Sequence, residues 1–366
     1  MQKIAIIGAG SVTFARMLVN DLLFFDPFKD AEFRLMDIDP DRLHFAENTL
    51  SLVNEVRKTK ATFIATTDRR KALEGADFAI TMIQVGGPDA IRADFEVCRK
   101  HGIRFVIGDS MGIPGISRAL RTIPALLDIA HTMEEVCPDA YLLNYANPMG
   151  MMMASLLRDS STQAVGLCHG VFGTARTLAR FIDVPYERVR YFCAGINHLA
   201  FFLKYEVDGQ DAYPLIRKAF DTTHKDQELV RQEMFRRLGY FMTESSYHLP
   251  EYLPYFIKSD ELIQEYDIEV DENLVKSAED AEIFGKVHQA FLEGRNLLAE
   301  GGQIRYIPRS RIRREHIGPG KEVVAFRVPD RPSGEYASRI CNAIFTGEGY
   351  TFYGNVLNTG LITNLP

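Results

Sequence analysis

The sequence predicts an α/β fold, in which a Rossmann-like, doubly wound parallel sheet is followed by a second, mixed α+β lobe. Over the first 170 residues, short apolar runs alternate with longer amphipathic ones, which is typical of βαβ units. The first apolar run leads into a Gly-x-Gly turn and then a helical pattern. After about residue 170, long amphipathic segments replace this alternation. We therefore expect a boundary near 170–195 and a second lobe whose chain returns onto the first.

Seven segments of the first part have the length and apolar character of strands. They are 2–7, 32–37, 61–66, 77–84, 104–107, 140–145 and 164–168. Helical patterns lie between several of them, for example at 11–24 and 40–57. The second part predicts helices at 171–182, 226–239, 275–298 and 335–346, strand structure over 191–206, and a crossing loop rich in Arg, Gly and Pro at 303–333.

The composition excludes several classes of protein. The 366 residues carry 42 Lys plus Arg against 49 Asp plus Glu, a net charge of −7, which argues against nucleic acid as the partner. No apolar stretch reaches the roughly 18 residues of a membrane span. The first residues run straight into a strand, which leaves no room for a signal peptide. Five scattered cysteines predict no disulfide framework, so we expect a cytoplasmic enzyme with no membrane partner.

The first turn carries part of a dinucleotide-binding motif. Gly8 permits a tight turn, and Gly10 lets the backbone approach a pyrophosphate at the start of the next helix. The third glycine of the motif is replaced by Thr13, so the turn alone is also compatible with an ordinary tight turn. Asp37 ends the second strand, where a carboxylate accepts from a ribose 2′-hydroxyl and favours NAD. We expect Gly8, Gly10, Ser11 and Asp37 to bind the cofactor.

Candidate metal and substrate residues follow the later strands. Cys168 comes just after an apolar strand, and His198 follows thirty residues later in Gly195-Ile196-Asn197-His198. A thiolate and an imidazole could share a divalent cation, whereas the alternative is a buried cysteine and a core histidine. Asn147 precedes a proline, so its amide either points into a cleft or belongs to a simple turn.

Taken together, these motifs resemble the NAD- and metal-dependent glycosidases of glycoside hydrolase family four, and most closely its α-galactosidase (melibiase) branch. The quoted motifs are Gly8-Ala9-Gly10-Ser11, Leu35-Met36-Asp37-Ile38-Asp39, Gly86-Gly87, Asp94-Phe95-Glu96-Val97-Cys98, Leu120-Arg121-Thr122-Ile123-Pro124, Met133 to Ala140, Asn147-Pro148, Cys168-His169, Gly195 to His198, Gly239 to Ser246 and Tyr353-Gly354-Asn355-Val356. As an ordered set they run along essentially the whole chain.

The resemblance implies hydrolysis by oxidation and elimination instead of the usual carboxylate pair. In the implied cycle NAD+ takes a hydride from C3 of the sugar, which makes the C2 proton acidic. A divalent metal holds the O2 and O3 oxygens, a base removes the C2 proton, and the aglycone leaves from C1. Water then adds, and NADH returns the hydride. The implied cofactors are therefore NAD+ and Mn²⁺ or another divalent metal.

The resemblance also implies roles for single residues. Cys168 and His198 match the metal ligands, and Asn147 and Arg92 match residues that contact the sugar. We accordingly expect an NAD-binding Rossmann domain at 1–190 and a substrate, metal and oligomerisation lobe at 191–366.

The acid and base are implied less directly. His169 occupies the position of an Asp acid in the phospho-sugar branch, and as a histidine it can still donate a proton near neutral pH. Tyr252 is the candidate base, with His248 and Glu244 as alternatives. A tyrosine base needs its pKa, about 10 when unperturbed, lowered by the nearby cation, and Asp109 is expected to support it.

Two departures leave the sugar open. The chain ends at Pro366, where relatives continue, which suggests a truncated or naturally short form, and Gly334 stands where the branch tends to carry Arg. We expect an α-galactoside as substrate, with an α-galacturonide or α-glucuronide as the alternative and a 6-phospho-glycoside disfavoured.

An NAD-dependent 2-hydroxy-acid dehydrogenase of the lactate and malate type has the same architecture, and a redox-sensing NAD-binding module is the non-enzymatic alternative. Family members often form homodimers or homotetramers, and we expect the same here.

Overall fold

The computed structural model describes residues 1–318 and 320–358. The chain divides into two compact units: one comprises Met1–Ile91, Arg118–Leu167 and Asn273–Pro366, and the other comprises Arg92–Ser117 and Cys168–Glu272. We call them the sheet unit and the hairpin unit. The expected division into 1–190 and 191–366 concerns function and stays a prediction, whereas by contacts the chain from Asn273 onward belongs with the sheet unit.

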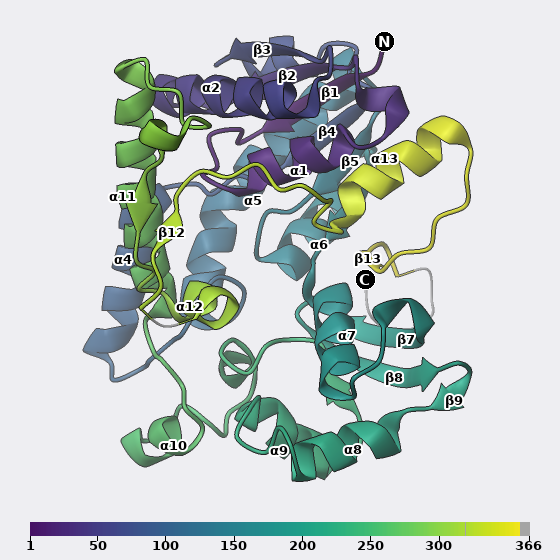
Figure 1. Cartoon of the computed structure of the whole chain (residues 1–366), viewed down its shortest axis with the longest axis vertical. Coiled ribbons are helices and arrows are strands. Elements are labelled where there is room, and N and C mark those ends of the chain that lie inside the picture. Colours follow the sequence, from purple (N-terminus) through teal and green to yellow (C-terminus); the bar gives the residue numbers. More distant parts are fainter. Residues whose placement is uncertain (319, 359–366) are drawn as a thin grey trace. The chain divides into compact units, whose positions relative to one another are not determined.

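The sheet unit contains a mostly parallel, seven-stranded sheet (Figure 1). Its strands, in spatial order, are β13 (Gly354–Asn355), β6 (Gln163–Leu167), β5 (Tyr141–Asn144), β4 (Phe78–Thr81), β1 (Lys3–Ile7), β2 (Glu32–Met36) and β3 (Thr62–Thr66). All neighbours pair in parallel except β13, which is antiparallel to β6. The order reverses at β1, as in a doubly wound sheet, which confirms the predicted fold class.

Helices cover the sheet. They are α1 (Phe14–Leu22), α2 (Pro40–Arg57), α3 (Arg69–Leu73), α5 (Gly112–Val136, whose first six residues count with the hairpin unit), α6 (Met149–Asp159) and α13 (Tyr336–Thr346), with the short η1 (Asp26–Phe28). Ala5 and Ile7 of β1 join one buried cluster, whereas Ile4 and Ile6 alternate to the other side and are equally inaccessible. Both faces of β1 are therefore buried, as a parallel strand requires.

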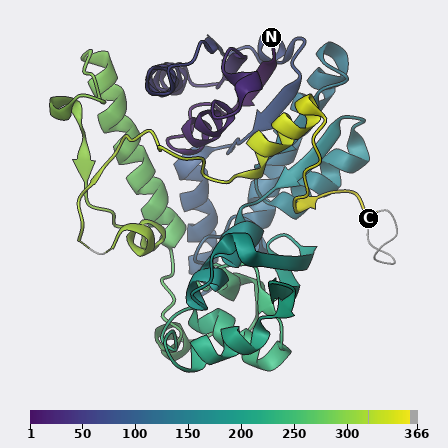
Figure 2. The same ribbon diagram turned by 45° about the vertical axis from the view of Figure 1, so that its right-hand side comes forward.

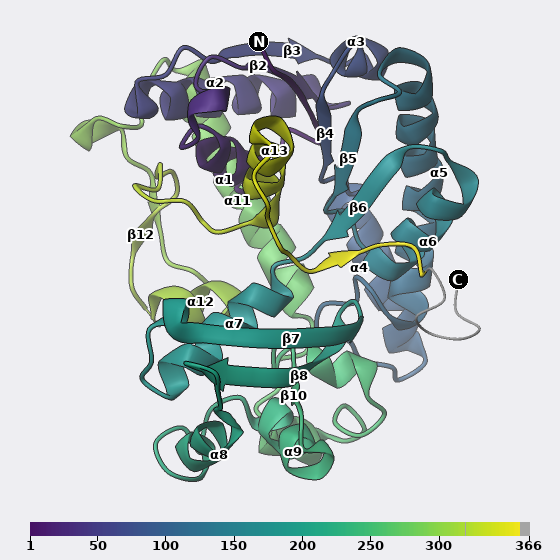
Figure 3. The ribbon, with the colours of Figure 1, turned by 90° about the vertical axis from the view of Figure 1, so that its right-hand side faces the viewer.

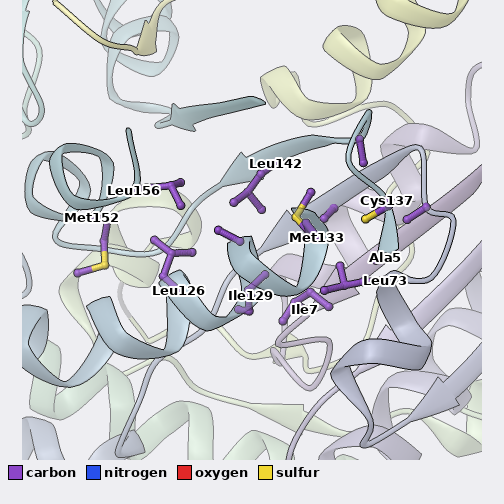
Figure 4. Close-up of a cluster of buried hydrophobic side chains, with 14 of the residues drawn as sticks. Ala5, Ile7, Leu73, Leu126, Ile129, Met133, Cys137, Leu142, Met152 and Leu156 are labelled. Atoms are coloured by element: carbon purple, nitrogen blue, oxygen red, sulfur yellow. The ribbon is translucent and has the colours of Figure 1, made fainter. Parts of the chain in front are cut away.

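One core cluster shows how this packing follows from the sequence (Figure 4). Leu126, Ile129 and Met133 of α5 recur at helical spacing and are buried on one face of the helix. They pack with Leu142 of β5 and with residues of α3 and α6. The helices that alternate with strands in the sequence thus form a layer on one side of the sheet.

The C-terminal part of the sheet unit contains the long helix α11 (Glu272–Leu292), green in Figure 2. Its Ile283 and Val287 pack on Phe45 of α2. The segment that follows contains η4 (Glu300–Gly302), β11 (Arg305–Tyr306), α12 (Arg311–Ile317) and β12 (Val323–Val324). The prediction of a loop over 303–333 was therefore incomplete. The segment contains the antiparallel pair β11 and β12, and α12 lies between these two strands in the sequence.

The hairpin unit is built on a small antiparallel sheet in the order β10 (Phe241–Met242), β8 (Leu199–Val207), β7 (Val189–Ile196), with β9 (Gln210–Asp211) also on β8 (Figure 3). Its helices are α4 (Gly87–Lys100, whose first five residues count with the sheet unit), α7 (Gly170–Phe181), η2 (Tyr186–Arg188), α8 (Tyr213–Asp221), α9 (Leu229–Leu238), η3 (Leu249–Tyr252) and α10 (Asp260–Glu265). The strand material expected at 191–206 is thus a hairpin that turns at Asn197-His198, where the peptide bond is cis.

The strand predicted at 104–107 was wrong. These residues join no sheet, because the backbone amides of Val106, Ile107 and Gly108 donate to the carboxylate of Glu251. The seventh strand of the main sheet is instead β13, near the end of the described chain. Within residues 1–318 and 320–358, no helix has the length and apolar character of a membrane span.

Candidate active site

The sheet unit holds the predicted nucleotide turn between β1 and α1. The amides of Gly8 and Ala9 both donate to the carbonyl of Met36, at 2.9 and 3.0 Å, so the turn is fixed to the end of β2. Gly8 has φ +86°, and a Cβ there would lie 3.1 Å from the backbone of Met82. The side chain of Ser11 accepts from the amide of Phe14 at 3.1 Å, which satisfies one of the free amides at the start of the helix.

Asp37 lies directly against this turn. It follows β2, and its Oδ2 accepts from the Gly10 amide at 2.9 Å. Arg42 of α2 donates to the Gly10 carbonyl at 3.1 Å, a contact that no sequence motif indicated. The structure therefore brings Gly8, Gly10, Ser11 and Asp37 together, and their role toward a dinucleotide stays a prediction.

Two further predictions concern the sheet unit. Asn147 precedes α6, forms a cis peptide bond with Pro148 and accepts at its carbonyl from Arg118 at 3.0 Å. Gly334 has φ +95°, a conformation that an arginine rarely adopts. Its neighbour Ser333 donates from its amide to buried Asp21 at 2.9 Å. The glycine at 334 therefore fits the local backbone, irrespective of any substrate contact.

The hairpin unit gathers the metal and acid–base candidates. Cys168 precedes α7, and its Sγ accepts from the Gly170 amide at 3.4 Å. Burial raises the pKa of the thiol, but the charge of His198, its hydrogen bond to that histidine and the charge of His169 lower the pKa to about 7. A thiolate at the start of a helix is also favoured by the helix dipole. Cys168 is therefore suited to act as an anionic ligand.

His198 is held at the turn of the β7–β8 hairpin and is buried. Gly195 is required here, because a Cβ would lie 2.6 Å from Cα of Ala200 on the opposite strand. Burial lowers the pKa of His198, but the Cys168 thiolate and the Glu244 carboxylate outweigh burial and raise it. The two predicted metal ligands thus lie within hydrogen-bonding distance of each other.

Glu244 reaches His198 through strand pairing. Phe241 and Met242 of β10 pair with Phe202 and Phe201 of β8, so the residues after β10 run beside the hairpin turn. Thr243 accordingly donates to the His198 carbonyl at 3.2 Å. Glu244, His198 and His248 offer ligand atoms that all lie within 4.8 Å of one another. Sequence reasoning considered Glu244 and His248 only as bases, and their ligand geometry became visible only in the fold.

His248 lies among three carboxylates. Its Nε2 is 3.2 Å from Glu251 and 3.4 Å from Asp109, and its Nδ1 is 3.5 Å from Glu244. Burial lowers the pKa of His248, but the charges of Glu244 and Tyr252 and its bonds to Asp109 and Glu244 raise it well above the ordinary value. His248 in turn lowers the pKa of Glu244 below its usual range, against the effect of burial. The cluster therefore favours a charged His248.

Tyr252, the candidate base, lies at the end of η3 with its hydroxyl 3.0 Å from Nδ1 of His198. Ser110 Oγ is 3.2 Å from the same nitrogen and donates to Asp109 at 2.7 Å. Burial raises the pKa of Tyr252 and Asp109 adds to the increase, whereas His248 and Ser110 lower it. The structure thus brings Tyr252, Asp109, His198 and Cys168 into one cluster.

Two further predicted residues, His169 and Arg92, are exposed. His169 is exposed at the N-cap of α7, and its carbonyl accepts from Gly173 at 2.9 Å. Its charge nevertheless acts on Cys168, so it lies near the thiol. Arg92 is exposed on α4.

The donor set fits a divalent transition metal ion. A thiolate, an imidazole and a carboxylate are the sulfur, nitrogen and oxygen ligands that such ions accept. Ligand atoms of His198, Glu244 and His248 lie within 4.8 Å of one another, and the Cys168 thiol is hydrogen-bonded to His198. Beside them lies a phenol that can exchange a proton. The arrangement can therefore hold a cation next to an acid–base group.

Comparison with known proteins agrees with this description. Residues 3–184 match the family described as family 4 glycosyl hydrolase, and residues 193–366 match its C-terminal domain. The chain belongs to glycosyl hydrolase family 4.

Within that family the chain lies near the α-galactosidases. It is 39% identical to the α-galactosidase of Bacillus subtilis (strain 168) over 100% of this chain and 79% of that protein. It is 33% identical to an α-galacturonidase of Thermoanaerobacterium saccharolyticum over 72% of this chain and 63% of that protein. A 6-phospho-α-glucosidase from gut microorganisms, solved in complex with NAD and Mn²⁺, has the same fold, with 20% identity, a TM-score of 0.67 and coverage of 84% and 76%.

Proposed function

We propose that this protein is an NAD- and divalent-metal-dependent α-glycosidase that hydrolyses α-galactosides by oxidation at C3 and elimination. The substrate class follows from the full-length similarity to the B. subtilis α-galactosidase. The observation that carries the mechanism is the cluster around His198, which lies 3.0 Å from the Tyr252 hydroxyl and is hydrogen-bonded to the low-pKa thiol of Cys168.

The residues fit the two cofactors. When bound, NAD+ supplies a hydride acceptor for C3 of the sugar, and Mn²⁺ supplies positive charge that stabilises negative charge on the sugar oxygens. The turn at Gly8, Gly10 and Ser11 with Asp37 would hold the dinucleotide. Cys168 and His198 would hold the metal ion, and the Glu244 carboxylate offers a further donor near His198.

Tyr252 is the candidate base that remains once the charges of His248 and Glu244 are considered. His248 is predicted to be charged and Glu244 to be a weak base, because the pKa of the first is raised and that of the second is lowered. The Tyr252 hydroxyl lies 3.0 Å from His198, and burial raises its pKa, an effect that the charge of His248 offsets only in part. Tyr252 would therefore need a cation held by His198 to lower its pKa before it could accept the C2 proton.

The remaining roles rest on the resemblance. His169, exposed and near Cys168, is proposed to protonate the leaving group. Asn147 and Arg92 are proposed to contact the sugar, and Asp109 to orient Ser110 and His248 near the base. Assembly as a homodimer or homotetramer and a cytoplasmic location also stay predictions.

Hydrolysis of an α-galacturonide is the second candidate, favoured by the 33% identity to an α-galacturonidase. The family match in both parts of the chain favours a glycosidase over a 2-hydroxy-acid dehydrogenase or a redox-sensing module. Net accumulation of NADH would distinguish a dehydrogenase, because the glycosidase returns the hydride.

The test is hydrolysis of nitrophenyl α-galactoside and nitrophenyl α-galacturonide, with NAD+ and Mn²⁺ each omitted in turn. We expect release of nitrophenol from the galactoside only when both are present, with no net NADH. Faster cleavage of the galacturonide would select the second candidate. Activity that needs neither NAD+ nor Mn²⁺ would contradict the mechanism.

A further inference from the structure

The segment before Asp109 has an unusual backbone arrangement. Val106, Ile107 and Gly108 are consecutive, buried, and outside any sheet. Their three amide groups all point to one carboxylate oxygen, Oε1 of Glu251. Successive amides that converge on one point form an anion-binding concavity. Here the anion is a side chain of the same chain, 143 to 145 residues away.

Glu251 is fully enclosed, with a side chain that is 0% exposed. Its Oε1 accepts from Ile107 at 2.6 Å and from Gly108 at 2.9 Å, and its Oε2 accepts from Gly108 at 3.1 Å. Oε2 also lies 3.2 Å from Nε2 of His248. A buried carboxylate with this many partners is held in one position.

The two segments that Glu251 joins both supply residues to the candidate site. The amide segment continues directly into Asp109 and Ser110, and Ser110 Oγ is 3.2 Å from His198. Glu251 itself precedes Tyr252, whose hydroxyl is 3.0 Å from the same histidine nitrogen. One carboxylate therefore sets how the phenol and the serine approach His198.

We propose that Glu251 is a positioning residue for the reaction: by holding the amides of Val106 to Gly108, it aligns Tyr252 with His198 and the Asp109-Ser110 pair. The inference rests on the proposed function, in which Tyr252 accepts the C2 proton. Glu251 acts through its neighbours, and its amide contacts are what matter, not its charge near His248.

Two conservative variants distinguish the amide contacts from the charge. If the amide contacts matter, the kcat of E251Q should exceed that of E251D; if the charge matters, the order should be reversed. E251Q keeps the side-chain length, so its amide oxygen still reaches the three backbone amides, but it removes the negative charge. E251D keeps the charge but is shorter by one carbon–carbon bond, about 1.5 Å, and cannot hold the same contacts. Misplacement of a catalytic group by about 1 Å is enough to cost about a hundredfold in rate.

The matched control is Glu279 of the sheet unit. It is also buried, and it accepts from the amides of Arg309 and Ser310 at 3.1 and 3.4 Å. E279A removes a buried, amide-bonded carboxylate that has no place in the proposed site. It therefore shows what a loss of stability alone does to the rate.

The experiment measures kcat and KM for nitrophenyl α-galactoside, with and without deuterium at C2, for the wild type, E251Q, E251D, E251A and E279A. We expect E251D and E251A to lose about a hundredfold in kcat, with a smaller change in KM and a larger C2 isotope effect. E251Q should keep kcat within about tenfold of the wild type, and E279A should keep kcat per folded molecule.

Three results would overturn the inference: a kcat of E251D above that of E251Q, an unchanged isotope effect in E251D, or an equal loss of kcat in E279A. If E251A does not fold, the ranking of E251Q and E251D still decides. The dependence of the wild type on NAD+ and Mn²⁺ in the same assay tests the proposed function separately, so a failure of one is distinguishable from a failure of the other.

Discussion

Replacement of Gly10 by alanine tests the nucleotide turn most directly. In the structure the Gly10 amide donates to Oδ2 of Asp37 at 2.9 Å, and its carbonyl accepts from Arg42. A Cβ on residue 10 would lie 2.3 Å from Cβ of Arg42 and 2.7 Å from Oδ2 of Asp37. Neither distance is tolerated, so the turn, the first turn of α2 or the carboxylate must move.

The size of the effect follows from these distances. Carbon atoms pack at about 3.5–4.0 Å, so the added methyl group and Arg42 must separate by more than about 1 Å. Such overpacking costs typically about 1–3 kcal/mol. The free variant relieves this strain by displacing the turn and Asp37, and NAD+ binding must restore their original positions, so the same energy is lost from binding. Because about 1.4 kcal/mol is a factor of ten in Kd, we expect NAD+ binding to weaken by roughly 5- to 150-fold.

Calorimetric titration of NAD+ into wild type, G10A and G285A measures this. Gly285 lies on the exposed side of α11, and a Cβ there meets no atom within 4 Å. G285A should leave NAD+ affinity unchanged and increase the free energy of unfolding by up to about 1 kcal/mol, because alanine favours the helix. If G10A binds NAD+ within twofold of the wild type, our interpretation of the turn is wrong.

Three further predictions follow from the other sites. C168S should lose Mn²⁺ affinity and nearly all activity but keep NAD+ affinity, as measured by separate titrations; retained Mn²⁺ binding would remove Cys168 from the ligand set. In the metal-free protein, iodoacetamide at pH 8 should modify Cys168 before Cys193, because a pKa of about 7 leaves about 90% thiolate there, whereas burial raises the pKa of Cys193 to about 12. Labelling of Cys168 should rise as the pH increases through 7. Peptide mass spectrometry identifies which cysteine is modified first, and modification of Cys193 before Cys168 would contradict this prediction. L142A, at a fully buried core position, should lower the free energy of unfolding by about 2–5 kcal/mol in urea, and a loss below 1 kcal/mol would contradict the packing in Figure 4.

Local patterns in the sequence were enough for the main sheet. The apolar runs predicted six of its strands to within a few residues. For inner strands such as β1 the reason is burial on both faces, which needs a short, continuous apolar segment, whereas β3 at the edge of the sheet has no buried residue. The same rule failed at 104–107, where Phe105, Val106 and Ile107 are buried but their backbone joins no strand. The side chains there are apolar because they are buried. The backbone amides of residues 106 to 108 donate to Glu251, a distant residue that no local pattern indicates.

What the sequence by itself determined is the fold class and the glycine turn followed by Asp37, whereas the pairing of Cys168 with His198 was implied only by the resemblance to a family. Each depends on residues next to a strand end or a tight turn, where the local backbone leaves few choices. Only the tertiary structure decided that Glu244 and His248 approach His198 and that Glu251 holds the segment before Asp109. Those contacts join residues some 45 to 145 positions apart along the chain. They arise from the pairing of β10 with β8 and from hydrogen bonds of buried groups, which depend on the whole fold and not on spacing along the chain.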